Sequence, residues 1–82
     1  MAYEVRLPEF GHAVTEAKVA RWQHEEGDAV EEGDVLVEIA TDNEIVHIPL
    51  QFRGIVKEIV ADEQDIVRVG DLLAIIDILE DK

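Results

Sequence analysis

The side chains in this sequence that could take part in chemistry are three histidines, several adjacent carboxylates and the polar triplet Asp42-Asn43-Glu44. An imidazole is a common metal ligand. However, the spacings of 12 residues between His12 and His24 and of 23 residues between His24 and His47 match no known ligand pattern. We therefore expect solvated or edge histidines and no metal site.

The adjacent carboxylates of Glu25-Glu26 and Glu31-Glu32 precede glycines, so we expect them at solvated turns. General acid–base catalysis needs a carboxyl group whose pKa is perturbed in a cleft, and so thin a domain predicts no such cleft. Cysteine is absent, which excludes a thiolate zinc site and a cysteine nucleophile. No Ser-His-Asp arrangement or phosphate-binding glycine loop is present. The sequence therefore offers no candidate residue for a small hydrolase.

The length and charge of the chain narrow the functional classes further. Its 82 residues suffice for one small domain over 1–82. The 20 acidic residues against 7 basic ones give a net charge of −13, which repels the phosphate backbone of nucleic acids. No apolar run approaches the roughly 18 residues of a membrane span, and a glutamate stands where a signal peptide has positive charge. We expect an intracellular protein that binds neither nucleic acid nor membrane.

An internal repeat with an offset of 37 residues organises the chain. Residues 26–36 align with residues 63–73, and six of the eleven aligned pairs are identical. Two copies are too few for a stack of repeats, so we expect two halves, about 3–40 and 41–77, that fold against each other with internal quasi-twofold symmetry. The same offset carries the 41–44 turn onto 78–81, and therefore places this turn and the termini at opposite ends of the domain.

The apolar residues follow the rhythm of strands, because Val35, Val37 and Ile39 alternate with their neighbours and several short runs are β-branched. A helix over 14–26 has only a poor apolar stripe and is the weaker alternative. Trp22 and Phe52 are expected to pack in the core or at its rim. An eight-stranded, flattened all-β sandwich or barrel is expected, with strands near 3–7, 16–23, 29–30, 35–41, 44–49, 54–60, 66–67 and 71–77.

A family resemblance runs without an obvious gap from about residue 3 to residue 77. The chain resembles a lipoyl domain of the dihydrolipoyl acyltransferase component of a 2-oxoacid dehydrogenase complex. The segments that carry the resemblance are Tyr3-Glu4-Val5-Arg6-Leu7-Pro8-Glu9-Phe10-Gly11, Thr15-Glu16-Ala17-Lys18-Val19, Trp22, Glu26-Gly27-Asp28-Ala29-Val30, Asp34-Val35-Leu36-Val37-Glu38, Thr41-Asp42, Ile48-Pro49, Gly54-Ile55-Val56 and Val69-Gly70.

The resemblance implies two four-stranded antiparallel sheets and a cofactor lysine on the hairpin between the fourth and fifth strands. In this chain Asn43 occupies the lysine position, with Asp42 and Glu44 flanking the turn. Lipoylation forms an amide on a lysine amine, and an asparagine side chain has no such nucleophile. We therefore expect no cofactor on this chain, although the family cofactor is lipoate. The other lysines, Lys18, Lys57 and Lys82, are expected away from the tip.

The resemblance also implies partners: the 2-oxoacid decarboxylase and dihydrolipoyl dehydrogenase components, and the enzymes that attach lipoate. Departures from the family pattern at Ala40, Glu44 and Leu50-Gln51 bear on docking to these enzymes and not on the fold. They fit a lysine replacement, a redesign or a degenerate copy, and their dispersion favours redesign or engineering. Family architecture would also bring His12 near His47.

Two alternatives remain at this point. A biotinyl carrier domain shares the architecture, but its attachment lysine lies between methionines, and the only methionine here is Met1. A non-catalytic scaffold or binding module on the same backbone would use a contact patch at Leu50, Gln51 and Phe52. The carrier interpretation predicts a cytoplasmic location, or the mitochondrial matrix if the parent protein is eukaryotic.

Overall fold

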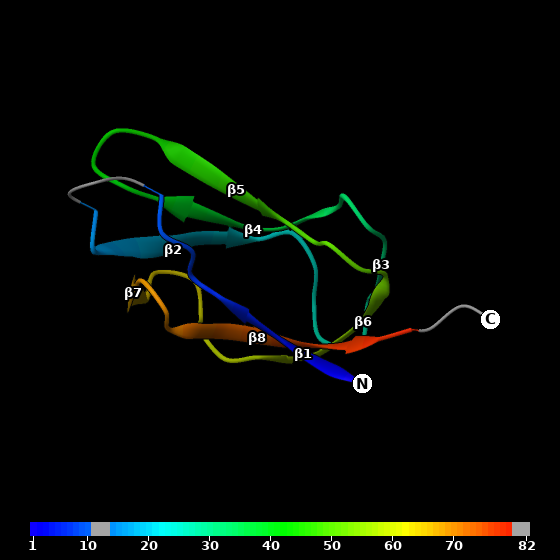
Figure 1. The fold of residues 1–82 in the computed structure, drawn as a ribbon. Coiled ribbons are helices and arrows are strands. Elements are labelled where there is room, and N and C mark those ends of the chain that lie inside the picture. The colour runs from blue at the N-terminus through cyan, green and yellow to red at the C-terminus, as the bar shows by residue number, and fades with distance from the viewer. Residues whose placement is uncertain (11–13, 80–82) are drawn as a thin grey trace.

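A computed structural model of the chain describes residues 1–10 and 14–79, which fold into eight strands (Figure 1). The described residues contain no helix, so the alternative of a helix over 14–26 is wrong and the eight-stranded all-β prediction is confirmed. Nor is there, within these ranges, a helix with the length and apolarity of a membrane span. The strands are β1 (Ala2–Arg6), β2 (Glu16–Trp22), β3 (Ala29–Val30), β4 (Val35–Ala40), β5 (Ile45–Pro49), β6 (Gly54–Ile59), β7 (Ile66–Arg68) and β8 (Leu72–Ile78).

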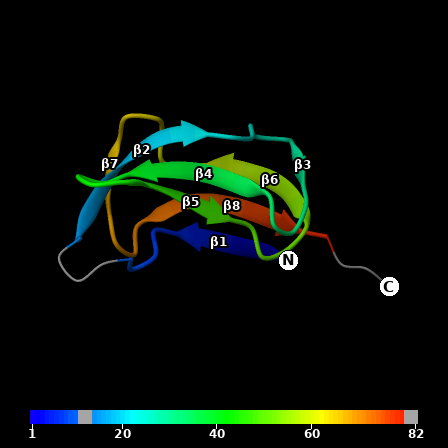
Figure 2. The ribbon, with the colours of Figure 1, turned by 90° about the horizontal axis from the view of Figure 1, so that it is seen from above.

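The strands form two antiparallel four-stranded sheets that face each other (Figures 1 and 2). Sheet A has the order β1-β8-β6-β3, and sheet B has the order β5-β4-β2-β7. If each strand of sheet A is replaced by the strand four places before or after it in the chain, the order of sheet A becomes the order of sheet B. This relation is the quasi-twofold symmetry predicted from the repeat. Each sheet takes two strands from each half, so neither half could form its sheet alone.

The repeated aspartates explain why the sequence repeats. Each carboxylate accepts a hydrogen bond from the backbone N–H three residues before it and so closes a tight turn. The four bonds, of 2.8 to 2.9 Å, join Glu25 N to Asp28, Glu31 N to Asp34, Asp62 N to Asp65, and Arg68 N to Asp71. The identical aspartates and Gly33/Gly70 of the repeat therefore set the turns, whereas the identical Val30/Val67 and Leu36/Leu73 are buried strand residues of the core.

One pair of equivalent turn positions differs in its backbone strain. Gly27 has a φ of 93°, and its equivalent Gln64 adopts a φ of 79° although it carries a side chain. Left-handed backbone disfavours such residues because Cβ crowds the following carbonyl. We expect Gln64→Gly to stabilise the fold by about 0.5–1 kcal/mol, the relief of strain exceeding the added entropy of the unfolded chain. Urea denaturation would measure it, with the reverse change Gly27→Gln expected to destabilise; a lower midpoint for Gln64→Gly would contradict this account.

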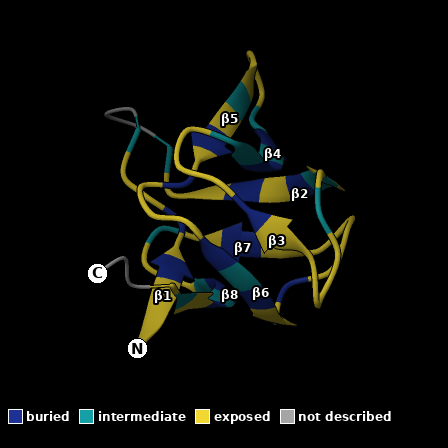
Figure 3. Cartoon of the chain, turned by 90° about the vertical axis from the view of Figure 1, so that its right-hand side faces the viewer, coloured by how far each residue is buried: buried dark blue, intermediate teal, exposed yellow. Residues whose placement is uncertain are grey.

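The core lies between the two sheets, and buried residues alternate with exposed ones along the strands of both (Figure 3). Trp22 packs against this core, and its indole N–H donates to the Ala61 carbonyl at 2.8 Å, as expected for a rim residue. Phe52 is 41% exposed and meets Tyr3 edge-on, with ring centroids 5.3 Å apart. The expected contact patch at 50–52 is wrong for Leu50, which is only 5% exposed.

The burial of Leu50 has a backbone cause. Its N–H donates to the Asp34 carbonyl, and its own carbonyl accepts from Gly33 N, both at 2.9 Å. These two bonds hold residue 50 against the turn that precedes β4, with its side chain in the core. Gln51 and Phe52 remain exposed.

Candidate functional site: the hairpin tip

The hairpin between β4 and β5 forms one end of the molecule, and the N-terminus and the end of β8 lie at the other, as predicted from the repeat (Figure 1). The last strand pair is Ala40 with Ile45. Beyond it, Thr41 N donates to the Glu44 carbonyl at 2.9 Å and closes the turn. The Thr41 hydroxyl lies 3.2 Å from the same carbonyl and accepts from Asn43 N at 3.3 Å and Glu44 N at 3.2 Å. The tip is therefore held by backbone and by Thr41.

The three residues singled out from the sequence share this turn. Asp42, Asn43 and Glu44 are all exposed, so the side chain at position 43 is presented to solvent. None of the three has an amine. The carboxamide nitrogen of Asn43 shares its lone pair with the carbonyl and is not a nucleophile.

The hydroxyl of Thr41 gives a test of how the tip is held. We expect Thr41→Val to free two backbone N–H groups, cost about 0.5 kcal/mol of stability at this half-buried position, and accelerate amide hydrogen exchange at Asn43 and Glu44. Hydrogen exchange followed by NMR measures this directly. Thr15→Val, an exposed threonine outside the turn, is the control and should leave exchange at the turn unchanged. Equal exchange in the Thr41 variant and the parent would contradict the assigned role.

An open groove runs from the hairpin onto the outer face of sheet B. Its lining comes from the start of β2, the end of β4, the turn and β7: Val14, Thr15, Glu16, Ala17, Lys18, Ala40, Thr41, Asp42, Asn43 and Ile66. Lys18 is paired with Ala40 across the β2–β4 ladder. The expectation that Lys18 lies away from the tip is therefore wrong. Its place in a strand was predicted, but which residues it faces depends on strands distant in the sequence.

The remaining lysines do not alter this picture. Lys57 is an exposed residue of β6 in the other sheet. Lys82 lies outside the described residues. Among the described residues, Lys18 is therefore the only lysine of the groove lining, and it lies beside the hairpin and not on its tip.

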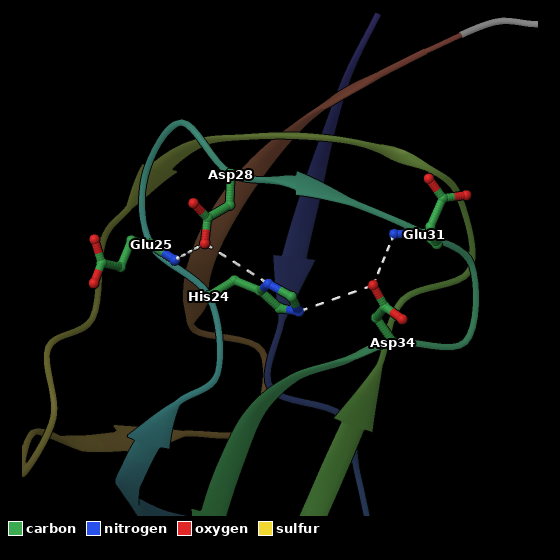
Figure 4. Close-up of polar contacts among 5 residues, drawn as sticks. All are labelled: His24, Glu25, Asp28, Glu31 and Asp34. Atoms are coloured by element: carbon green, nitrogen blue, oxygen red, sulfur yellow. Dashed lines mark hydrogen bonds and ion pairs between the residues drawn. The ribbon is translucent and has the colours of Figure 1, made fainter.

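His24 is the most enclosed histidine of the described chain, and Figure 4 shows it between two of the aspartate turns. Its side chain is 25% exposed, with Nδ1 3.8 Å from Asp28 Oδ2 and Nε2 3.9 Å from Asp34 Oδ2. The prediction of a solvated or edge histidine therefore holds only in part, because most of the His24 side chain is covered. Both carboxylates already accept turn N–H groups, which indicates a structural position.

Of the other two histidines, the structure describes only His47. His47 is exposed on β5, with Nε2 3.8 Å from Glu38 Oε2. His12 lies outside the described residues, as does its expected approach to His47. Across residues 1–10 and 14–79, no group of three or more potential ligands is placed to hold a metal ion.

The carboxylates flanking the turns are exposed, as expected for Glu25-Glu26 and Glu31-Glu32. Glu26 has a further role, because its Oε2 accepts from Ile59 N at 2.8 Å. The equivalent carboxylate in the second half, Glu63, accepts from Trp22 N at 3.0 Å. Each carboxylate thus joins a turn of one half to a strand of the other. The repeat contained this pair, but only the structure identifies what the carboxylates bind.

Comparison with known sequences gives one family and a consistent set of relatives. Residues 3–76 match the Biotin_lipoyl family, described as "Biotin-requiring enzyme". The chain is 40% identical over 77 residues to the dihydrolipoyllysine-residue acetyltransferase component of the pyruvate dehydrogenase complex from Staphylococcus epidermidis, and 39% identical to that from Staphylococcus aureus. Each match covers 94% of this chain but only 18% of the relative's length.

Solved structures with the same architecture include a lipoyl domain. The lipoyl domain of the 2-oxoglutarate dehydrogenase complex from Azotobacter vinelandii matches with a TM-score of 0.76 and 30% identity, covering 89% of this chain and 92% of that one. Urea carboxylase from Kluyveromyces lactis matches with a TM-score of 0.78 and 24% identity, over 93% of this chain and 6% of its own. The second likeness concerns the fold alone.

Proposed function

Since this chain belongs to the Biotin_lipoyl family, we propose that it is a lipoyl-type carrier domain of a 2-oxoacid dehydrogenase acyltransferase whose attachment position has lost its lysine. The observation that carries this proposal is Asn43 at the exposed tip of the 41–44 turn, where the resemblance places the lipoyl-lysine. The turn is intact, and the amine is missing. The proposal holds for a degenerate, redesigned or engineered chain alike.

The residues present do not fit covalently bound lipoate. Attachment requires an amine that forms an amide with the cofactor's carboxyl group, and the 42–44 segment has only carboxylates and a carboxamide. Lys18 lines the groove beside the hairpin, but it projects from the middle of β2 and not from a turn. An attaching enzyme that recognises a lysine at the tip of a hairpin would meet Lys18 on the face of a sheet.

Two observations support the lipoyl over the biotinyl branch of the family. The relatives at 39–40% identity are dihydrolipoyllysine-residue acetyltransferases. In addition, the only methionine is Met1, so no methionine flanks position 43. The carrier would have no active site of its own. Its family partners would be the decarboxylase and dihydrolipoyl dehydrogenase components, and the bacterial relatives favour the cytoplasm.

Intact-mass spectrometry after incubation with a lipoate ligase, ATP and lipoate tests this proposal. The unaltered chain is expected to keep its mass, because no amine stands at the tip. The Staphylococcus aureus lipoyl domain serves as the positive control in the same reaction. Any lipoyl adduct on the unaltered chain would overturn the assignment of a lost attachment site.

A further inference from the structure

A row of four residues crosses the outer face of sheet B next to the hairpin. Ile45 pairs with Ala40, Ala40 with Lys18, and Lys18 with Ile66, so one residue of each strand contributes. Directly paired residues project from the same side of a sheet. Here that side is the outer one, because the next residues in sequence, Ala17 and Val67, are buried and paired with each other. The row spans about 14 Å, three interstrand steps.

The two ends of this row are unusually exposed for their residue type. Ile45 is 50% exposed and Ile66 is 61% exposed. Single exposed apolar residues are common, but two isoleucines in one row, beside a groove that runs to the hairpin, form a small apolar surface.

The internal symmetry allows these two positions to be compared with their equivalents in sheet A, which shows whether the fold itself requires isoleucine there. The equivalent row of sheet A consists of Ala2, Asp77, Ile55 and Ala29, paired in that order. Ala2 and Ala29 therefore stand where sheet B has Ile45 and Ile66. Since the same backbone is built with alanine at both ends of the row, the two exposed isoleucines are not required to form the sheet.

Charge distinguishes this face from the rest of a strongly acidic chain. Three cations project from the outer face of sheet B, Lys18, Arg21 and Arg68, against two carboxylates of its strands, Glu16 and Glu38. In the strand register Arg21 lies opposite Glu38 and Arg68 opposite Glu16, whereas Lys18 lies between Ala40 and Ile66. None of these three cations has an ion-pair partner among the described residues.

We propose that the Ile45–Ala40–Lys18–Ile66 row is a contact surface for a partner protein segment that presents a carboxylate between apolar side chains. The carboxylate meets Lys18, and the apolar side chains cover the two isoleucines. A cation that has apolar neighbours and no ion pair can take a carboxylate without displacing one. At physiological salt the screening length is about 8 Å, so a group in contact with Lys18 feels this cation, the one charged residue of the row, together with Glu16 and Asp42 of the groove lining.

Two short peptides provide the probe: acetyl-Leu-Gly-Glu-Gly-Leu-amide and its lysine counterpart, acetyl-Leu-Gly-Lys-Gly-Leu-amide. Alternate side chains of an extended peptide point the same way, so the two leucines and the central charge span about 14 Å on one side. Titrations followed by ¹H–¹⁵N NMR on the unaltered chain are expected to shift resonances at 14–18, 40–45 and 66, with the acidic peptide binding at least about threefold more tightly than the basic one. Equal affinities, or shifts centred on Tyr3 and Phe52, would overturn the proposal. So would self-association, detected as the same shifts on concentrating the chain without peptide.

Two variants separate the charge from the apolar contacts. Lys18→Glu should reverse the preference, so that the basic peptide binds more tightly. Ile66→Ala, which copies the residue at the equivalent position Ala29, should weaken both peptides while leaving the fold intact. Val60→Ala is the control, since Val60 is 43% exposed but lies outside the row. A preference that survives Lys18→Glu, or a Val60 variant that weakens binding as much as Ile66→Ala, would contradict the assignment.

Discussion

An Asn43→Lys variant is expected to acquire one lipoyl group from a lipoate ligase, at residue 43, where the parent chain acquires none. The physical reason is that the turn already presents position 43 to solvent, and its backbone is held by Thr41 and by the strand pairing below it. The substitution therefore supplies the missing amine without rebuilding the tip. Intact mass and peptide mapping report the extent and the site of modification.

A matched variant tests whether lipoylation requires the amine at residue 43 or accepts an amine elsewhere in the same turn. Glu44→Lys places an equally exposed lysine one residue along the same turn, and we expect it to be modified far less than Asn43→Lys. If Asn43→Lys folds but stays unmodified, the tip is no longer recognised, and the chain is better described as a scaffold on the lipoyl-domain backbone. Circular dichroism and the thermal midpoint establish folding in each case.

The second large effect is expected at Gly54, the buried first residue of β6. A Cβ built there would lie 2.5 Å from the Asp77 carbonyl oxygen and 2.8 Å from Ile76 Cγ2. Such distances are well inside van der Waals contact, and the oxygen belongs to the backbone of β8, which cannot rotate away. Gly54→Ala should therefore lower the free energy of unfolding by about 3 kcal/mol or more, measured by urea denaturation.

Gly27→Ala is the matched control for this clash. A Cβ at Gly27 meets nothing within 4 Å, so the only cost there is the left-handed backbone at a φ of 93°. We expect that cost to be about 1 kcal/mol, clearly less than at Gly54. Equal losses at the two positions, or a Gly54 variant as stable as the parent, would show that β6 and β8 are not packed as closely as described.

The strands and turns were predictable because their causes are local. Alternation of apolar residues sets strands such as Val35–Ala40, and the spacing of glycine and aspartate sets the turns. The internal repeat added the symmetry, and with it the position of the 41–44 turn opposite the termini. The candidate tip at residues 42–44 followed from the family resemblance and not from the residues themselves.

The features that escaped prediction depend on contacts between distant segments. Lys18 lies beside the hairpin because β2 pairs with β4 in one particular register. Leu50 is buried because its backbone pairs with residues 33 and 34. The exposed row of sheet B joins residues of four strands, and no local pattern places Ile45 and Ile66 in one row with Lys18. Register across a sheet is set by global packing, which a single sequence does not display.

The claim that this carrier fold lacks only its attachment amine is tested most directly by one competition reaction. Equimolar parent chain and Asn43→Lys variant are mixed with a lipoate ligase, ATP and lipoate, and the products are resolved by intact-mass spectrometry. We expect one lipoyl group on the variant and none on the parent chain in the same tube. A lipoyl adduct on the parent, at Lys18 or elsewhere, would contradict it.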